Sequence, residues 1–156
     1  MILNNFGAIA QMGERLVCNQ KVRGSIPRGS TRYIMEFNIL FWLFTKHIIA
    51  DYYMQYPWMY KHKGTYGHPG GIAHAVWHGI LTNIVLLYFV GPITAALLGT
   101  LDAFIHYHVD YAKNKVWAKT NTNPGEQLYW IIHGTDQLAH GMTYFFIVHL
   151  LAHGHV

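Results

Sequence analysis

Histidine and aspartate recur at helical spacing inside four long apolar stretches of this chain. The spacing is three or four residues within each stretch, and the members are His47, Asp51 and Gln55; His74 and His78; His106 and Asp110; and His133, Asp136 and His140. Residues at this spacing share one face of an α-helix. Each stretch therefore predicts a helix with a polar stripe, and His108 lies off the stripe of its own segment.

Imidazole and carboxylate groups on facing helices are the ligands with which helical bundles hold metal ions. They suit zinc, iron or manganese better than magnesium or calcium. Cys18, the only cysteine, precedes every stripe, which excludes a thiolate site. We therefore predict a divalent transition metal, with zinc preferred and iron or manganese as alternatives. Its predicted ligands are His47, Asp51, His74, His78, His106, Asp110, His133, Asp136 and His140.

Other roles follow from the same stripes. Asp51 and Asp136 are the candidate catalytic bases where they do not bind the metal, and Gln55 and Gln137 are predicted to orient ligands. Two other interpretations stay open: a hydrogen-bond network without metal, and a proton or ion pathway. Histidines in loops or near the C-terminal end are interpreted as ordinary surface residues, namely His62, His68, His149, His153 and His155.

The elements that carry the stripes are long and apolar. Hydrophobic residues make up 52% of the chain and charged residues 12%, which is too apolar for an ordinary soluble domain. The stretches cover residues 37–56, 72–90, 93–112 and 126–152, and a bilayer is crossed by about 20 apolar residues. The run 80–101 contains no charged residue. The predicted fold class is an all-α, polytopic membrane four-helix bundle.

The loops predict the orientation of this bundle. Segments 57–71 and 113–125 carry five of the six lysines that follow residue 35. With four spans both loops lie on one side, which the positive-inside rule makes cytoplasmic. The polar stripes then meet in the half of the bundle nearest these loops. A single helix over 72–101, giving three spans, and a soluble all-α bundle with a very apolar core are the alternatives.

The first 34 residues differ in character from the rest. They hold five basic residues and one acidic residue, whereas the remaining chain holds six of each, so the net charge of +4 arises in this segment. Residues from about 8 to 32 have codons compatible with a transfer RNA gene read in frame. We therefore expect residues 1–34 not to be native, with Met35 as the start of a single membrane domain over 35–156. A disordered basic tail is the alternative.

Four motifs resemble one known family. They are "HIIADYYMQYPWMYKHK" (47–63), "HAVWHG" (74–79), "HYHVDYAKNK" (106–115) and "DQLAH" (136–140). The chain resembles, over about residues 37–151, the bacterial and phage family called domain of unknown function 3307. The pattern also loosely resembles that of inner-membrane metal-dependent hydrolases, by analogy of fold alone. The family pattern covers His47, Asp51, His78, His106, Asp110, Asp136 and His140, whereas His74 and His133 lie outside it.

The resemblance implies a small polytopic membrane protein with no established activity. We expect it in the bacterial inner membrane, with the basic loops in the cytoplasm as the positive-inside rule predicts. From the stripes we expect a metal-binding membrane protein, in one version a hydrolase of a lipid-like or phosphate-containing substrate. The alternative is a non-enzymatic phage or prophage membrane effector, or an ion or proton conduit. The lipid bilayer is the expected partner, nucleic acid is not, and the oligomeric state stays open.

Overall fold

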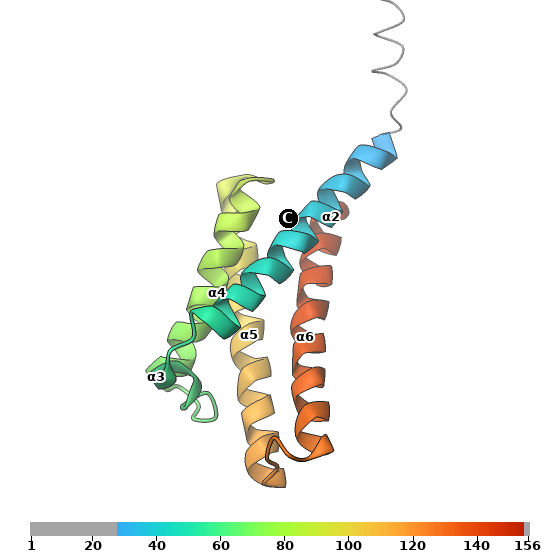
Figure 1. Cartoon of the computed structure of the whole chain (residues 1–156). Helices are drawn as coiled ribbons and strands as arrows, with labels where there is room; N and C mark the ends of the chain where they lie inside the picture. Colours follow the sequence, from blue (N-terminus) through green and yellow to red (C-terminus); the bar gives the residue numbers. More distant parts are fainter. Residues whose placement is uncertain (1–27, 155–156) are drawn as a thin grey trace, which may run out of the picture. The chain divides into compact units, whose positions relative to one another are not determined.

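The computed structural model describes residues 28–154, and all regular structure in this range is helical (Figure 1). The elements are α2 (Arg28–Ile48), the π-helical turn η1 (Ile49–Tyr53), α3 (Pro57–Tyr60), α4 (Pro69–Leu87), α5 (Pro92–Thr120) and α6 (Gln127–Ala152). The all-α prediction is therefore confirmed. The chain divides into two units, Met1–Met35 and Glu36–Val156, and the packing described below belongs to the second. The expectation for residues 1–34 falls largely outside the described residues.

The long helices correspond to the four predicted stretches. The first stretch forms the end of α2 together with η1, and α5 continues past the predicted end at residue 112 to Thr120. Residues 88–91 separate α4 from α5, so the alternative of one helix over 72–101 is wrong. Pro57, Pro69 and Pro92 each stand at the first position of a helix, where their fixed φ is favourable and no amide hydrogen is needed.

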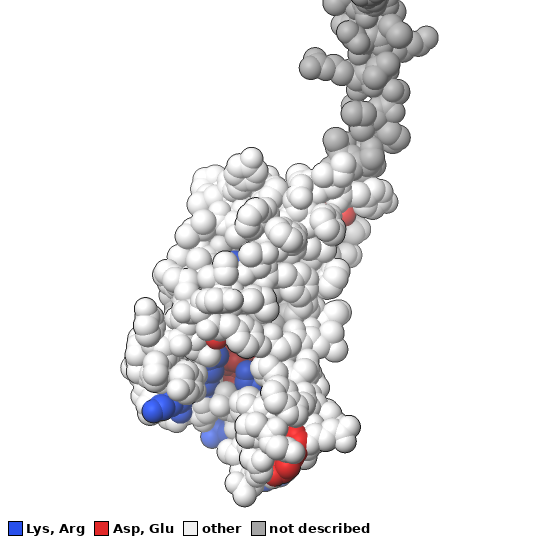
Figure 2. Space-filling view, viewed as in Figure 1, with Lys and Arg blue, Asp and Glu red and all other residues white. Residues whose placement is uncertain are grey.

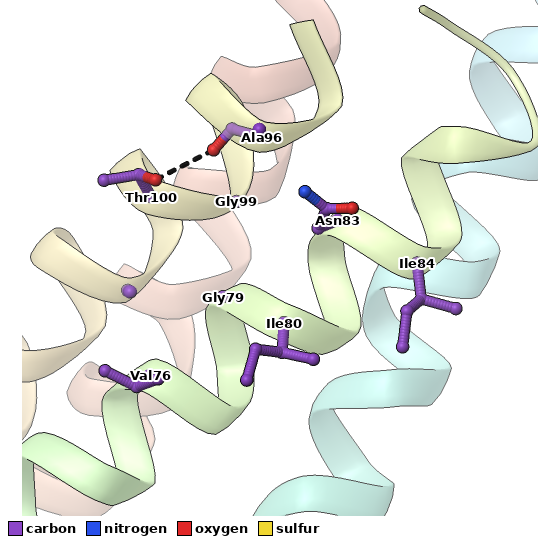
Figure 3. Close-up of a pocket in the computed structure, with 9 residues that line it drawn as sticks. Val76, Gly79, Ile80, Asn83, Ile84, Ala96, Gly99 and Thr100 are labelled. Carbon is purple, nitrogen blue, oxygen red and sulfur yellow. Dashed lines mark hydrogen bonds between the residues drawn. The ribbon is translucent and has the colours of Figure 1, made fainter. Parts of the chain in front are cut away.

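Glycines set how closely α4 approaches α5. Figure 3 shows Gly79 and Gly99 where the two helices face each other. A Cβ on Gly79 would lie 2.5 Å from the carbonyl oxygen of Gly99, and a Cβ on Gly99 would lie 2.6 Å from that of Gly79. Because no side chain separates the backbones, the α4 histidines are held close against the α5 stripe.

The interior of this unit has an apolar end and a polar end. Buried aliphatic and aromatic residues fill the end formed by the later part of α4 and the start of α5, and they are Ile39, Leu43, Leu86, Ala95, Leu98, Tyr144, Ile147 and Val148. Toward the loops that follow η1 and α5, the buried residues are mainly histidine, aspartate and lysine. The candidate site therefore lies in the half of the bundle that the stripes predict.

Among the described helices, α4 alone is long and apolar enough to cross a membrane, with a mean hydropathy of 1.3. The core helix of a soluble protein meets the same criterion, and 44% of this segment is buried within the unit. The multi-span arrangement therefore stays a prediction.

Candidate metal centre

One layer of the bundle collects histidines and aspartates from five elements, α2, η1, α4, α5 and α6. We call it the metal layer and define it as His47, Asp51, His74, His78, His106, Asp110, Asp136 and His140. Asp51 lies in η1, where the π-helical turn extends α2. Such turns occur frequently at functional sites, because the wider turn changes the direction in which side chains project.

The Oδ1 atom of Asp51 faces imidazole nitrogens from α4 and α5. Its Oδ1 lies 3.1 Å from Nε2 of His74 and 3.2 Å from Nε2 of His78. Nε2 of His106 is 4.0 Å from the same oxygen and 3.0 Å from Nε2 of His74. One ligand atom from each of these four residues lies within 4.8 Å of the others. Three imidazoles and one carboxylate thus converge as a candidate ligand set.

Asp110 forms the centre of a second, overlapping group. Its Oδ2 lies 3.3 Å from Nε2 of His106, and its Oδ1 lies 3.9 Å from Nε2 of His140. His106, Asp110 and His140 also place one ligand atom each within 4.8 Å of one another. Since His106 belongs to both groups, the two candidate sets are adjacent parts of one layer.

Several ligand atoms of this layer are buried without a hydrogen-bond partner among the described residues. They are Asp51 Oδ1, His78 Nε2, Asp136 Oδ1 and His140 Nε2, which face one another in pairs at 3.2 and 3.4 Å without hydrogen-bond geometry. Leaving such atoms unsatisfied costs about 1–3 kcal/mol each, which native proteins rarely accept. A cation among these nitrogen and carboxylate atoms would satisfy them together, so the donor set fits a divalent metal.

Two lysines border the layer on the loop side. Lys63 Nζ lies 2.6 Å from Asp110 Oδ2, and Lys113 Nζ lies 2.7 Å from Asp136 Oδ2 and 3.1 Å from Asp110 Oδ1. Burial acts to lower the pKa of Lys113, but the two carboxylates outweigh it and raise the pKa above its ordinary value. Both ammonium groups are therefore held against the carboxylates of the layer. From the sequence, Lys63 and Lys113 are loop charges that could attract phosphate headgroups or reflect topology alone, and their carboxylate partners are not indicated.

A third lysine lies on the opposite side of the layer. Lys46 Nζ donates to Asp102 Oδ2 at 2.6 Å and to the carbonyl oxygen of His78 at 3.3 Å. Thr82 Oγ1 donates to the same Asp102 oxygen at 2.6 Å. Sequence reasoning missed Lys46 and Asp102. Asp102 lies four residues before His106, so extension of the α5 stripe by one turn would have indicated it.

The loop side of the layer opens into a recess. We call it the mouth pocket; it measures about 230 Å³ and is lined by Asp51, Tyr52, Gln55, Tyr60, Lys63, Lys113, Asn114, Trp117, Tyr129, His133 and Gln137. Figure 2 shows blue and red atoms gathered in a hollow of a largely white face. Small molecules from outside would reach Asp51 through this pocket.

Most of the predicted site residues come together, but they differ in position. His47 borders Asp51, with Nε2 3.2 Å from Oδ2, and lies outside both convergent groups. Asp136 likewise lies outside them, with Oδ1 3.4 Å from His140 Nε2. His133 is farther away: its Nε2 is 3.3 Å from the hydroxyl of Tyr52, in the wall of the mouth pocket.

The two glutamines also take different positions. Gln137 contacts two residues of the metal layer, as predicted for an orienting residue. Its Oε1 lies 3.1 Å from His47 Nε2, and its Nε2 donates to Asp51 Oδ2 at 3.4 Å. Gln55 donates to the backbone oxygen of Asp51 at 3.1 Å. His108 points away from the layer, toward the Phe104 carbonyl oxygen. The metal-ligand roles themselves stay predictions.

Comparison with known families agrees with the motifs. The model of the family described as a protein of unknown function, DUF3307, matches residues 39–155. The chain belongs to the DUF3307 family. Searches of curated proteins and of solved structures each found no match. Membership in DUF3307 brings no activity with it, so a function has to be argued from the site.

Proposed function

We propose that this DUF3307 protein is an integral membrane protein with a divalent metal ion in its metal layer, acting as a hydrolase of a lipid-like or phosphate-containing substrate. The convergence of Asp51, His74, His78 and His106 is the observation that carries the proposal. Catalytic zinc sites use nitrogen and oxygen ligands of this kind and keep a position for water. Zinc is the metal we propose, with iron and manganese as alternatives.

The chain's own residues would hold and orient the reacting groups. When bound, the metal supplies an activated water and polarises the scissile group. Asp51 serves as a ligand, because its Oδ1 faces two histidine nitrogens. Asp136, outside both convergent groups, is then the carboxylate available to accept a proton, and Gln137 orients His47 and Asp51.

The surface of the unit supports the membrane part of the proposal. Large apolar side chains project outward from all four long helices, among them Phe41, Ile84, Leu97, Phe104 and Leu138. Soluble monomers rarely expose contiguous apolar patches beyond a few hundred Å². The histidines and aspartates of the metal layer lie inside instead, which is the arrangement required of charged residues within a bilayer. We propose the inner membrane of a bacterium, with the mouth pocket facing the cytoplasm.

A continuous conduit is less well supported than a site. The polar chain runs from Lys113 through the metal layer to Asp102 and Thr82, and there it meets the apolar core. Ile39, Leu43 and Leu98 are at most 1% exposed in that core. A proton or ion entering from the mouth would therefore meet a closed end, which favours a binding site over a pathway.

Metal analysis of the purified chain in detergent tests the proposal. We expect a divalent transition metal in the wild type, and a loss of affinity of at least about 10–100-fold in Asp51→Ala or His140→Ala, the range found even for residues that only support a ligand. His108→Ala is the matched control, because His108 lies on α5 and points away from the layer.

Activity provides the second readout. Release of phosphate from a water-soluble phosphate monoester should stop on chelation and return with zinc. Absence of metal from the wild-type protein would contradict the proposal. Proton flux into liposomes that survives chelation and is lost in Asp51→Asn would favour the conduit instead.

A further inference from the structure

The mouth pocket contains polar atoms that the candidate metal does not engage. Trp117 and His133 line the pocket, and their Nε1 and Nδ1 atoms are buried without a hydrogen-bond partner among the described residues. An indole N–H only donates. When the Tyr52 hydroxyl donates to Nε2 of His133, the hydrogen of the neutral imidazole lies on Nδ1, which makes this atom a second neutral donor.

Two ammonium groups add charged donors to the same pocket. Lys63 and Lys113 line it, with side chains that are 6% and 9% exposed. Each ammonium has three N–H donors. Within the described residues, Lys63 is paired with one carboxylate and Lys113 with two. Donors from both therefore remain for a ligand, so the pocket is rich in donors.

The net charge of the whole site determines whether the ligand is an anion or a cation. The buried carboxylates are those of Asp51, Asp102, Asp110 and Asp136, and the buried ammonium groups are those of Lys46, Lys63 and Lys113. Counted without the histidines, these groups leave one negative charge in excess. A divalent cation changes this excess to one positive charge, so the loaded site attracts an anion.

The pocket is small and has one rigid wall. Its volume of about 230 Å³ is below the range of about 300–1,000 Å³ that encloses a drug-sized ligand. The rings of Trp117 and Tyr129 stack with centroids 4.7 Å apart and an interplanar angle of 2°, which fixes the direction of the indole N–H. A compact anion with several acceptor oxygens fits these donors.

We propose that the mouth pocket binds a phosphoryl group, held by Lys63, Lys113 and the Trp117 N–H beside the metal ligands. This assignment rests on the proposed function, because the metal supplies the positive charge. The three terminal oxygens of a phosphoryl group match the several donors, and hydrogen bonds to such charged acceptors are strong. Gln55 Oε1, buried and without a partner among the described residues, adds an acceptor for a P–OH group.

The phosphoryl group has two possible sources, a soluble ester or a lipid headgroup. Lys113 also lines a second cavity of about 350 Å³ between α5 and α6, whose walls include Val109, Ala112, Val116 and Ile131. This apolar groove would accept the chain of a lipid whose headgroup lies in the mouth pocket. Ala112 lines this groove and not the mouth pocket, so Ala112→Trp is directed at the groove.

Titration of the zinc-loaded full chain with inorganic phosphate, followed by calorimetry, tests the assignment. Trp117→Phe removes the N–H and keeps a ring against Tyr129. We expect it to weaken phosphate binding about tenfold or more, the cost of one hydrogen bond to a charged group, with metal content unchanged. The matched control is Trp77→Phe, since the N–H of Trp77 is also buried without a partner among the described residues but lies outside the pocket.

The outcomes separate the two proposals. Equal phosphate affinity in Trp117→Phe and wild type, or no phosphate binding by the metal-loaded wild type, overturns the pocket assignment and leaves the metal site intact. A protein that binds neither metal nor phosphate overturns both. Glycerol phosphate and phosphatidic acid in micelles then distinguish the sources: tighter binding of the lipid, reduced by Ala112→Trp, assigns a lipid headgroup, and equal binding assigns a soluble phosphate.

Discussion

Lys46 and Asp102 form an ion pair that is almost completely removed from solvent. Their side chains are 5% and 1% exposed, and Nζ lies 2.6 Å from Oδ2. Because Lys46 also donates to the carbonyl oxygen of His78, the pair connects α2 with both α4 and α5 next to the metal layer. We infer that it fixes the position of His78 as well as balancing charge.

Removal of one member should therefore destabilise the fold more than removal of both. Lys46→Met leaves the carboxylate of Asp102 buried without its ammonium group, at an expected cost of about 3–5 kcal/mol. The double variant Lys46→Met with Asp102→Leu has no unpaired charge, and it should recover much of the loss. Thermal and denaturant unfolding in detergent, followed by circular dichroism, measures both.

Thr45→Val serves as the control for this experiment, because the Thr45 hydroxyl donates to the carbonyl oxygen of Phe41 within its own helix. Its substitution should change stability by less than about 1 kcal/mol, since the net contribution of an exposed hydrogen bond is small. If the double variant is no more stable than Lys46→Met, the ion pair is not the source of the effect.

For individual residues, the sequence identified the candidate metal ligands but not the lysines that form ion pairs beside them. His74 and Asp51 stand out in apolar stretches because spacing alone shows that they share a face with other ionisable groups. A lysine such as Lys46 or Lys63 gives no such signal, because its long side chain reaches its partner in a direction that spacing does not define. Its acceptor, Asp102 or Asp110, becomes known only when the helices are packed together.

Helix α4 meets α5 through glycine, and this contact determines the geometry of the layer. Gly99→Val would place a branched side chain against the carbonyl oxygen of Gly79 and against Cβ of Asn83, which would lie 2.6 Å and 3.1 Å from the new Cβ. The helices would have to separate, which moves His74 and His78 away from His106. We expect a loss of stability of about 1–3 kcal/mol, the usual cost of overpacking, together with lower metal content.

Gly134→Ala is the matched control on α6, because a Cβ there meets nothing within 4 Å. It should keep the metal and raise stability by up to about 1 kcal/mol, since glycine inside a helix is less favourable than alanine. Unfolding and elemental analysis of the two variants measure both effects. Normal metal content in Gly99→Val would show that the close contact does not position the histidines.

The helices themselves were largely predictable, and the irregular parts were not. Apolar periodicity and the Gly91-Pro92 break identified four long helices. The turn η1 was not predicted, because a π-helical turn follows from packing at Asp51 rather than from local propensity. The extension of α5 to Thr120 was also missed, since residues 113–120 are mostly polar. In the fold, Lys113 and Trp117 of this extension contact Asp136 and Tyr129 of α6.

The second unit combines a polar, ionisable half of its interior with many exposed large apolar side chains. The fully buried side chains include His78, His106 and Asp102, whereas Tyr88, Ile93 and Leu138 are 88%, 77% and 65% exposed. Burial of ionisable groups costs free energy that their mutual pairing has to offset. Exposing the aromatic and aliphatic residues to water also costs free energy. A lipid environment around the helices would remove this cost, which is the physical basis of the membrane proposal.

The arrangement of loops gives this proposal a direct test. If four helices cross the bilayer, the loop before α4 and the end of α5 lie on one side, and residues 88–91 lie on the other. In a Cys18→Ser background, Thr65→Cys and Lys119→Cys should react with a membrane-impermeant thiol reagent only from the cytoplasmic side. Gly91→Cys, where the added side chain meets nothing within 4 Å, should react only from the opposite side.

Two results would contradict the four-span arrangement. One is labelling of Thr65→Cys and Lys119→Cys from opposite sides, which would require an odd number of spans between the two positions. The structure instead places two antiparallel helices in contact, α4 and α5, between them. Labelling of all three positions from both sides, with protein recovered in the aqueous fraction without detergent, would mean that the exposed apolar faces pair with another chain. The mouth pocket would then open to water, and the accessibility of the three labelled positions would carry no information about a membrane.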